Sequence, residues 1–338
     1  MKPIVQSLLL VSFLVFTACD SSKKLVKKIN YLTVAVPEEG SLKLTQYTNE
    51  SENILHPQII SDPITKMLMW YAPPLLSVSP DGGKIAYIAA ANKFKNLNLK
   101  NIKGGQSVIQ RTFNRNVVDM NFSPDGKNIV FTEEGEGNSD IYMINATEGV
   151  AIQQLVSTSA NELSPSFSPD GQSVFFAKSI GSNYHIWSLN RETSLLTQFT
   201  QGYTPSLAPN GVDLIISRNN KDTSFGEIWM VNINKGVETL LLSDPEKSYS
   251  SPNISPDGKY IICVGTTKGS KTKPMNLDLY LVKLDGTKLT QLSFHGGHDV
   301  SHVWNADGNS VFFISQRGNA EGDYNVWKMD LTNILKTL

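Results

Sequence analysis

The chain has 338 residues, of which 40% are hydrophobic and 18% are charged, and its formal net charge is −1. This length accommodates two average domains or one large repeat array. A charge balance this close to neutral provides no basic field, which argues against nucleic acid as a partner. We therefore expect a packed globular protein.

Residues 1–19 have the features of an export signal. Met1-Lys2 is a short basic start, and the apolar run from Leu8 to Phe16 is too short to span a bilayer as a stable anchor. The run Phe16-Thr17-Ala18-Cys19 resembles the bacterial lipobox, in which the cysteine is lipidated and becomes the mature N-terminus. The resemblance implies membrane anchoring through lipid on Cys19. The alternative is an ordinary signal peptide that is cleaved nearby.

Residues 20–30 follow as a polar tether with four lysines. We interpret this tether as a solvated linker, and contact with anionic lipid headgroups is the alternative. The second cysteine of the chain, Cys263, lies in an apolar run and is expected to be a buried small hydrophobe. If Cys19 carries lipid, Cys263 has no partner, so no disulfide framework is expected.

From residue 75 onwards the chain repeats a stretch that is clearest at Ser168-Pro169-Asp170-Gly171, followed by an apolar strand. Six copies align on the third residue of the stretch: Asp81, Asp125, Asp170, Asn210, Asp257 and Asp307. By subtraction, these residues are 44, 45, 40, 47 and 50 positions apart. Every copy has an apolar residue three positions before this reference residue and four and six positions after it. Chance similarity is a poor explanation for so regular a pattern.

Each copy is predicted to contain four antiparallel strands. Pro, Asp and Gly favour a tight turn, so the stretch joins the first two strands as a hairpin, and the second strand is apolar enough to be buried on both faces. A third strand with an aromatic residue is expected at residues 140–144, 185–189, 227–231, 279–282 and 325–329. A more polar fourth strand is expected at residues 153–156, 197–200 and 290–293. We interpret the aromatic stripe as a packing seam between sheets.

Four strands in a repeat of about 45 residues are typical of a β-propeller blade. The sequence therefore predicts an all-β, six-bladed propeller of four-stranded antiparallel blades within residues 31–338. Residues 49–73 are interpreted as an insertion, and a degenerate first blade, which would make seven, is the alternative. Propellers hide their open edges by completing the last blade with a strand from the other terminus, so we assign residues 42–47 to the sixth blade.

The Ser-Pro-Asp-Gly stretch before an apolar strand resembles the WD40-like Pro-Asp repeats of the TolB propeller family, over roughly residues 75–331. The resemblance concerns the propeller only. The TolB family carries a sizeable α/β domain before the propeller, and the stretch from Cys19 to Pro74 is too short to hold one. Because the resemblance covers the propeller alone, a Tol-like role in envelope assembly is an alternative function and not the expected one.

The most unusual polar cluster lies in residues 294–302, which contain three of the five histidines of the chain. In a propeller, the loops between blades emerge on the face opposite the hairpin turns. His302 stands five positions before the reference residue, where three other copies have Pro165, Pro205 and Pro252. That position should lie in an innermost strand, at the mouth of the central channel.

Two kinds of ligand site are considered on this face. His295, His298 and His302 with Asp299 could ligate a divalent metal, and some oligogalacturonate lyases, which resemble this repeat class, hold a metal by histidines on a propeller. A polar loop between blades is the simpler interpretation, so no cofactor is expected. Further candidate binding residues follow second strands, with solvated loop charges as the alternative: Glu133, Arg218 and Arg317.

Serine-hydrolase chemistry has little support, because Ser173 and Ser310 begin strands and lack the final glycine of a nucleophile elbow. We therefore expect a non-catalytic, monomeric, lipid-anchored protein of the bacterial cell envelope, facing the periplasm or the outside. Its propeller face is expected to bind an envelope protein or a glycan. The alternative is a metal-assisted polysaccharide lyase that uses the histidine cluster.

Overall fold

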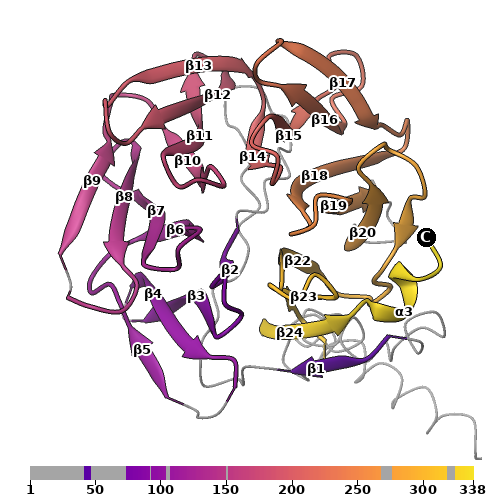
Figure 1. The fold of residues 1–338 in the computed structure, drawn as a ribbon, viewed down its shortest axis with the longest axis horizontal. Coiled ribbons are helices and arrows are strands. Elements are labelled where there is room, and N and C mark those ends of the chain that lie inside the picture. The colour runs from indigo at the N-terminus through magenta and orange to yellow at the C-terminus, as the bar shows by residue number, and fades with distance from the viewer. Residues whose placement is uncertain are drawn as a thin grey trace, which may run out of the picture.

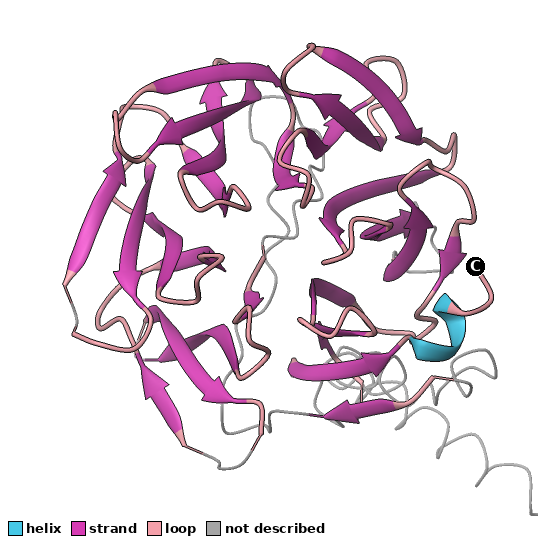
Figure 2. Ribbon diagram, viewed as in Figure 1, coloured by secondary structure: helices cyan, strands magenta, loops and turns pink. Residues whose placement is uncertain are grey.

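The computed structural model describes residues 42–46, 74–91, 93–103, 107–149, 151–267, 276–317 and 324–338. These residues form six four-stranded antiparallel sheets, arranged around a central axis as the blades of a propeller (Figures 1 and 2). The six-bladed prediction is confirmed over the seven-bladed alternative. The predicted signal peptide, tether and insertion lie outside the described residues. No helix in the described part of the chain is long and apolar enough to cross a membrane.

In blades one to five the four strands follow one another in sequence, and in blade six β1 takes the fourth place; the first strand of each blade lies nearest the axis (Figure 1). Blade one contains β2 (Leu76–Val78), β3 (Lys84–Ala91), β4 (Phe94–Asn101) and β5 (Val108–Gln110). Blade two contains β6 (Val117–Phe122), β7 (Asn128–Glu134), β8 (Ser139–Asn145) and β9 (Ile152–Val156). Blade three contains β10 (Glu162–Phe167), β11 (Ser173–Ile180), β12 (Asn183–Asn190) and β13 (Leu196–Gln201). Blade four contains β14 (Tyr203–Leu207), β15 (Asp213–Asn219), β16 (Gly226–Asn232) and β17 (Val237–Leu242). Blade five contains β18 (Lys247–Ile254), β19 (Tyr260–Thr267), β20 (Leu277–Lys283) and β21 (Thr290–Gln291). Blade six contains β22 (Asp299–Trp304), β23 (Ser310–Ser315), β24 (Asn325–Asp330) and β1 (Leu44–Gln46).

The Ser-Pro-Asp-Gly stretch closes the hairpin between the first and second strands, as predicted. In blade three, Ser168 Oγ donates to Asp170 Oδ1 (2.6 Å) and accepts the backbone N–H of Ser173 (2.9 Å). Gly171 adopts a φ of 71°, which glycine tolerates because it has no Cβ. The same bond joins Ser79 to Asp81, Ser123 to Asp125 and Ser255 to Asp257. The turn is thus a structural unit that repeats because the blade geometry repeats.

The second strands form the core, as their apolar runs predicted. All six residues of β23 are buried, and Ile129, Val130 and Phe131 of β7 are fully inaccessible to solvent. Cys263 on β19 is also fully buried, and this burial raises the pKa of its thiol to about 12. The prediction that Cys263 is a buried small hydrophobe is confirmed.

Polar side chains four positions before the reference residue join neighbouring blades near the axis. Ser77 Oγ accepts the backbone N–H of Phe122 in the next blade (3.0 Å). Ser206 Oγ accepts the N–H of Ile254 (3.2 Å) in the same way. These contacts fix the innermost strands relative to one another, and so they fix the shape of the channel between them.

The ring closes through β1, which pairs antiparallel with β24 as the outermost strand of blade six. Leu44 is opposite Met329, and Asp330 donates its N–H to the backbone oxygen of Lys43 (3.0 Å). The predicted closure by a strand from residues 42–47 is confirmed. The chain ends shortly after the short helix α3 (Thr332–Leu335).

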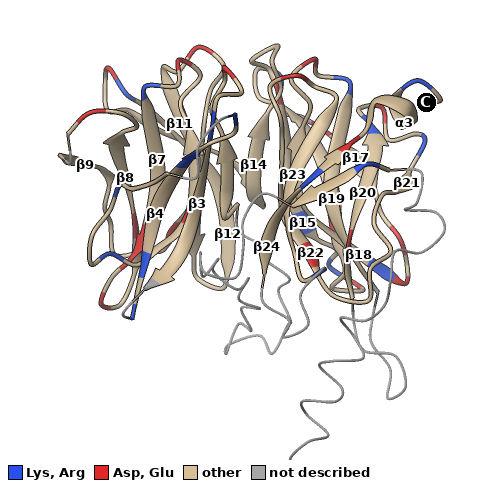
Figure 3. Ribbon diagram, turned by 90° about the horizontal axis from the view of Figure 1, so that it is seen from below, with Lys and Arg blue, Asp and Glu red and all other residues tan. Residues whose placement is uncertain are grey.

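We call the two ends of the propeller the turn face and the loop face. The turn face carries the Ser-Pro-Asp-Gly turns and the turns between third and fourth strands, because Lys84 beside the first hairpin turn is paired with Asn101 at the end of β4. Helix α3 and the C-terminus lie on the turn face (Figure 3), where Leu331 donates its N–H to Asn309 of the last hairpin turn. The loop face carries the connections between blades and those between second and third strands.

Candidate functional site

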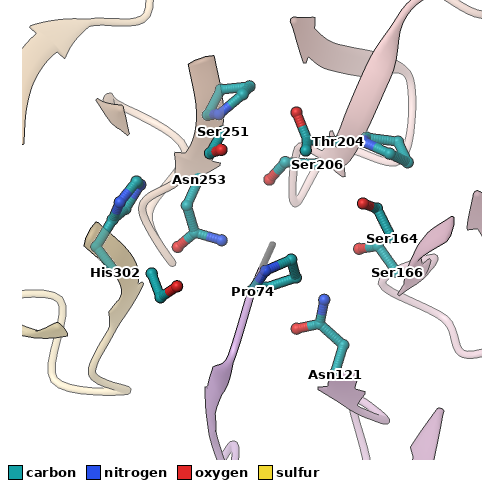
Figure 4. A pocket seen from close by; sticks show the side chains of 12 residues that line it. Pro74, Asn121, Ser164, Ser166, Thr204, Ser206, Ser251, Asn253 and His302 are labelled. Atoms are coloured by element: carbon teal, nitrogen blue, oxygen red, sulfur yellow. The ribbon is translucent and has the colours of Figure 1, made fainter. Parts of the chain in front are cut away.

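A cavity of about 50 Å³, partly open to solvent, lies on the axis between the innermost strands (Figure 4). Its polar lining consists of hydroxyl, amide and imidazole groups, from Asn121, Ser164, Ser166, Thr204, Ser206, Ser251, Asn253, Ser301 and His302. Three prolines complete the lining: Pro74, Pro205 and Pro252. None of the described residues of this lining carries a carboxylate, an ammonium or a guanidinium group. The cavity is therefore suited to hydrogen bonding with an uncharged polar group of a ligand.

Four hydroxyl residues of this lining hold a left-handed backbone conformation, which we call the hydroxyl ring: Ser164 (φ 55°), Thr204 (φ 46°), Ser251 (φ 54°) and Ser301 (φ 50°). They occupy the same position in blades three to six, six residues before the reference residue. The pairing register of the two innermost strands shifts at each of them, so each lies in a β-bulge. Residues other than glycine rarely adopt this conformation, and those that do are concentrated at functional sites.

Neighbouring blades hold the hydroxyl ring in place. Ser164 donates its backbone N–H to Asp119 Oδ2 of blade two (2.8 Å), and the other oxygen of the buried Asp119 accepts the N–H of Thr132 (3.2 Å). Ser251 donates its N–H to Ser217 Oγ of blade four (2.9 Å), and this oxygen is also bonded to the Thr204 hydroxyl (2.8 Å). The strained backbone positions are thus fixed by bonds that cross from blade to blade.

His302 follows the fourth member of the hydroxyl ring and lines the cavity from β22, as the sequence predicted for the channel mouth. Its Nε2 donates to the backbone oxygen of Ile262 in blade five, at 2.9 Å. Complete burial lowers the pKa of the imidazole to about 4, and hydrogen bonds with the backbone of Ile262 and Ser251 oppose this shift only in part. His302 is therefore neutral at neutral pH and links blades five and six.

His295 and His298 lie in the connection between these two blades. His295 is buried, and its Nδ1 accepts the backbone N–H of Gly297 (3.0 Å). His298 donates its backbone N–H to Gln316 Oε1 (3.0 Å). Burial lowers the pKa of the His298 imidazole, and the charge of Asp299 offsets part of this effect. Within the described residues, no three His, Cys, Asp or Glu side chains are grouped so that they could hold a metal ion.

Asp299 and Arg317 form a buried ion pair at the loop-face end of blade six. Arg317 Nη2 donates to Asp299 Oδ2 at 2.5 Å, and Arg317 Nε donates to Ser315 Oγ at 3.0 Å. The guanidinium also lies 5.3 Å from the centroid of the Phe313 ring. The sequence placed Arg317 in a loop, where exposure to solvent is the simplest expectation. The structure instead buries it against the carboxylate of another candidate residue.

Glu133 and Arg218 are held in ion pairs within blades two and four. Glu133 is paired with Arg115. Arg218 binds both carboxylate oxygens of Glu238 (2.7 and 3.1 Å), and its guanidinium lies 4.8 Å from the centroid of the Trp229 ring. Neither Glu133 nor Arg218 is among the residues that line the cavity. The structure thus places these two candidates, and Arg317, in three separate blades.

Sequence reasoning missed Glu162, which occupies in blade three the position of Asp299 in blade six, eight residues before the reference residue. Glu162 is completely buried, and burial raises the pKa of its carboxyl group even though Lys178 Nζ lies 3.5 Å away. The signal was present in the repeat alignment, because these two copies carry an acidic residue where the others do not. Two buried carboxylates, each with a basic partner, therefore lie in blades on opposite sides of the channel.

Comparison with known proteins identifies the family. Residues 65–273, more than half of the chain, match the TolB beta propeller domain. No curated protein matches the sequence.

Among solved structures, TolB from Acinetobacter baumannii superposes with a TM-score of 0.59 at 19% identity, over 73% of this chain and 63% of that one. Oligogalacturonate lyase from Vibrio parahaemolyticus superposes with a TM-score of 0.53 at 11% identity, over 86% and 96% of the two chains. An oligogalacturonate lyase in complex with manganese gives 0.52 at 13% identity, over the same shares. At these identities the likeness shows the fold alone, and this chain spans less than two thirds of the Acinetobacter protein. From the family match, the chain belongs to the TolB β-propeller domain family.

Proposed function

We propose that the chain is a lipid-anchored, non-catalytic protein of the bacterial cell envelope whose loop face binds a protein or glycan partner. The observation that carries the proposal is the hydroxyl ring around the channel. A left-handed conformation at a residue other than glycine costs on the order of 1–3 kcal/mol and persists only where the surrounding structure enforces it. Four such residues at one position of four blades keep a set of hydroxyl groups at fixed places around the cavity.

The chemistry of the cavity supports recognition by hydrogen bonds. Hydroxyl and amide groups both donate and accept, so they can bind the backbone of a peptide loop or the hydroxyls of a sugar. The buried carboxylates at the starts of the innermost strands of blades six and three have basic partners, Asp299 with Arg317 and Glu162 with Lys178, and the Asp119 carboxylate accepts backbone N–H groups of Ser164 and Thr132. The connections of the loop face lead into the starts of these innermost strands, and loops on a rigid scaffold are the usual place for selectivity. The lipobox resemblance at Cys19 supports the envelope location.

The proposal is tested by blocking the cavity. Ser166 lines it and has an intermediate exposure, so Ser166→Tyr should fill the mouth without disturbing the hydroxyl ring. The control is Ser107→Tyr, an equal change at an exposed position of blade one, away from the channel.

Crosslinked membrane extracts of the native host should yield a partner with the unmodified protein and with Ser107→Tyr but not with Ser166→Tyr. Competition with purified envelope glycans distinguishes a sugar ligand from a protein. Equal recovery with Ser166→Tyr would overturn the proposal. A Tol-like role is a special case of the same proposal, in which the recovered partners are components of envelope assembly.

A second candidate function is a metal-assisted polysaccharide lyase, which the fold shared with a manganese-bound oligogalacturonate lyase favours. It would use His295, His298, Asp299 and His302. His295 and His302 would have to leave their bonds to Gly297 and Ile262 to act as ligands. Metal analysis of the purified protein and incubation with polygalacturonate test this candidate. A stoichiometric divalent ion that is lost in His298→Ala/His302→Ala, together with shortening of the polymer, would establish it.

A further inference from the structure

Exposed aliphatic side chains are concentrated on the rim of the turn face. Nine large hydrophobic residues are exposed in the described part of the chain, and six of them, which we call the aliphatic rim, lie at the starts of fourth strands: Val108, Ile109, Leu195, Leu196, Val237 and Leu289. They are 37 to 63% exposed. Strand register places them at the turn face, since Leu196 is paired with Leu189 and Val237 with Asn232, beside the ends of third strands. Blades one, three, four and five all contribute.

Basic side chains accompany this rim. Arg191, Lys235 and Lys288 are exposed in the turns that lead into the same fourth strands, together with the acidic residues Glu192 and Asp285. Single exposed aliphatic residues are ordinary features of a protein surface. Six of them gathered along one rim, interleaved with charged residues of both signs, form an amphipathic surface of the kind that binds the interface of a lipid bilayer.

An open groove between blades four and five adds a site for a lipid headgroup on the same face. Met230, Tyr260 and Leu284 contribute its apolar part, and charges of both signs border it: Lys259, Lys283, Asp213 and Asp285. Lys259 is paired with Asp257 (3.1 Å), so a phosphate group would be bound mainly by Lys283, and an ammonium group by Asp213 or Asp285. A zwitterionic phospholipid headgroup fits this arrangement better than a purely anionic one.

The path of the chain also favours membrane contact through the turn face. Lys43, at the start of β1, is bonded to Asp330 beside helix α3, so the described chain enters the propeller on the turn face. Cys19 lies 23 positions before Leu42, which bounds their separation at roughly 80 Å. An anchor joined to this face holds the rim at high effective concentration next to the bilayer, so that weak contacts suffice to orient the molecule.

We propose that the aliphatic rim rests on the surface of a phospholipid bilayer, with the groove between blades four and five holding a zwitterionic headgroup. This inference rests on the proposed lipid anchor at Cys19. The channel mouth on the loop face then points away from the membrane, where it is accessible to a partner. The turn face, which carries the repeated Ser-Pro-Asp-Gly turns, would then contact the membrane in addition to closing the hairpins.

The test measures which face touches lipid. The full chain, purified from membranes with its anchor, is reconstituted into vesicles of phosphatidylethanolamine and phosphatidylglycerol. Single-cysteine variants Leu195→Cys and Val237→Cys carry an environment-sensitive fluorophore on the turn face. Matched controls are Phe113→Cys, in the connection between blades one and two, and Ile180→Cys, at the loop-face end of β11; both positions are exposed and hydrophobic. The native Cys263 stays unlabelled because it is fully buried.

Fluorophores on the rim should shift their emission to the blue and lose intensity with spin-labelled lipid, whereas those on the loop face should be quenched by aqueous iodide. Equal behaviour of the two faces, or lipid quenching confined to the loop face, would overturn the proposal. A chain that does not float with the vesicles contradicts both the anchor and this orientation. Partner capture in detergent with Ser166→Tyr remains an independent test of the loop-face function.

Discussion

The buried pair of Asp299 and Arg317 should contribute strongly to the stability of blade six. Asp299 is 0% and Arg317 5% exposed, and their charged atoms are 2.5 Å apart. Removing one partner breaks a buried charge pair in a medium of low dielectric constant, which costs about 3–5 kcal/mol. We expect Asp299→Asn and Arg317→Met each to lower the free energy of unfolding by about this amount. Urea denaturation at neutral pH, followed by tryptophan fluorescence, measures it.

A variant that lacks both charges tests whether Asp299 and Arg317 stabilise the fold through each other. Asp299→Asn/Arg317→Met has neither charge, so its cost should fall short of the sum of the single costs by about 2–3 kcal/mol. The control is the exposed pair Lys259–Asp257, whose side chains are 71% and 47% exposed at 3.1 Å. Lys259→Met should change the stability by less than about 1 kcal/mol. Additive costs at Asp299 and Arg317, or costs as small as that of the control, would refute the reasoning.

Three further predictions concern other parts of the propeller. The unfolded state binds a proton at His302 below about pH 6.5, whereas the folded state binds it only near pH 4, so stability should fall as the pH is lowered through this range. His302→Pro introduces the residue that blades three to five have at this position, so the variant should fold, and its thermal midpoint should depend less on pH. An unchanged pH dependence of the thermal midpoint would contradict the assignment of this effect to His302. Gly265→Ala should destabilise by about 1–3 kcal/mol, because the new Cβ would lie 2.3 Å from the Tyr280 ring; urea unfolding should show a partial recovery in Gly265→Ala/Tyr280→Leu, and no loss in the single variant would disprove the clash. Ala208→Ser supplies the hydroxyl that blade four lacks, next to Asn210 Oδ1, which already accepts the N–H of Val212 as the turn aspartates of other blades accept theirs; it should stabilise by about 0.5–1.5 kcal/mol in the same assay, whereas a destabilised protein would show that this turn has a different geometry.

The sequence predicted the architecture well because its main determinants are local. Proline, aspartate and glycine set the backbone of the hairpin turn, and alternating apolar residues set the strands on either side. When such a unit is repeated six times, arranging the sheets in a ring buries the faces of each sheet against its two neighbours. The closing strand at Leu44–Gln46 was also predicted, because an unpaired edge in blade six required a partner.

The candidate site was predicted only in part, because it depends on contacts between blades. His302 was placed correctly by its position relative to the reference residue. The hydroxyl ring was not predicted, since a residue that precedes proline usually adopts an extended backbone, and Ser164, Thr204 and Ser251 all precede one. The burial of Arg317 and Glu162 was missed for a related reason, because it depends on how the ends of the strands pack.

Photocrosslinking in the native host tests the central claim, that the loop face is the binding surface, most directly. A photoreactive residue is placed at Phe113 or Ile180 on the loop face and, in parallel, at Leu195 or Val237 on the turn face. We predict that the loop-face positions form a defined adduct with an envelope partner, and that Ser166→Tyr abolishes it. A partner adduct formed only from the turn-face positions, or one that Ser166→Tyr leaves unchanged, would contradict it.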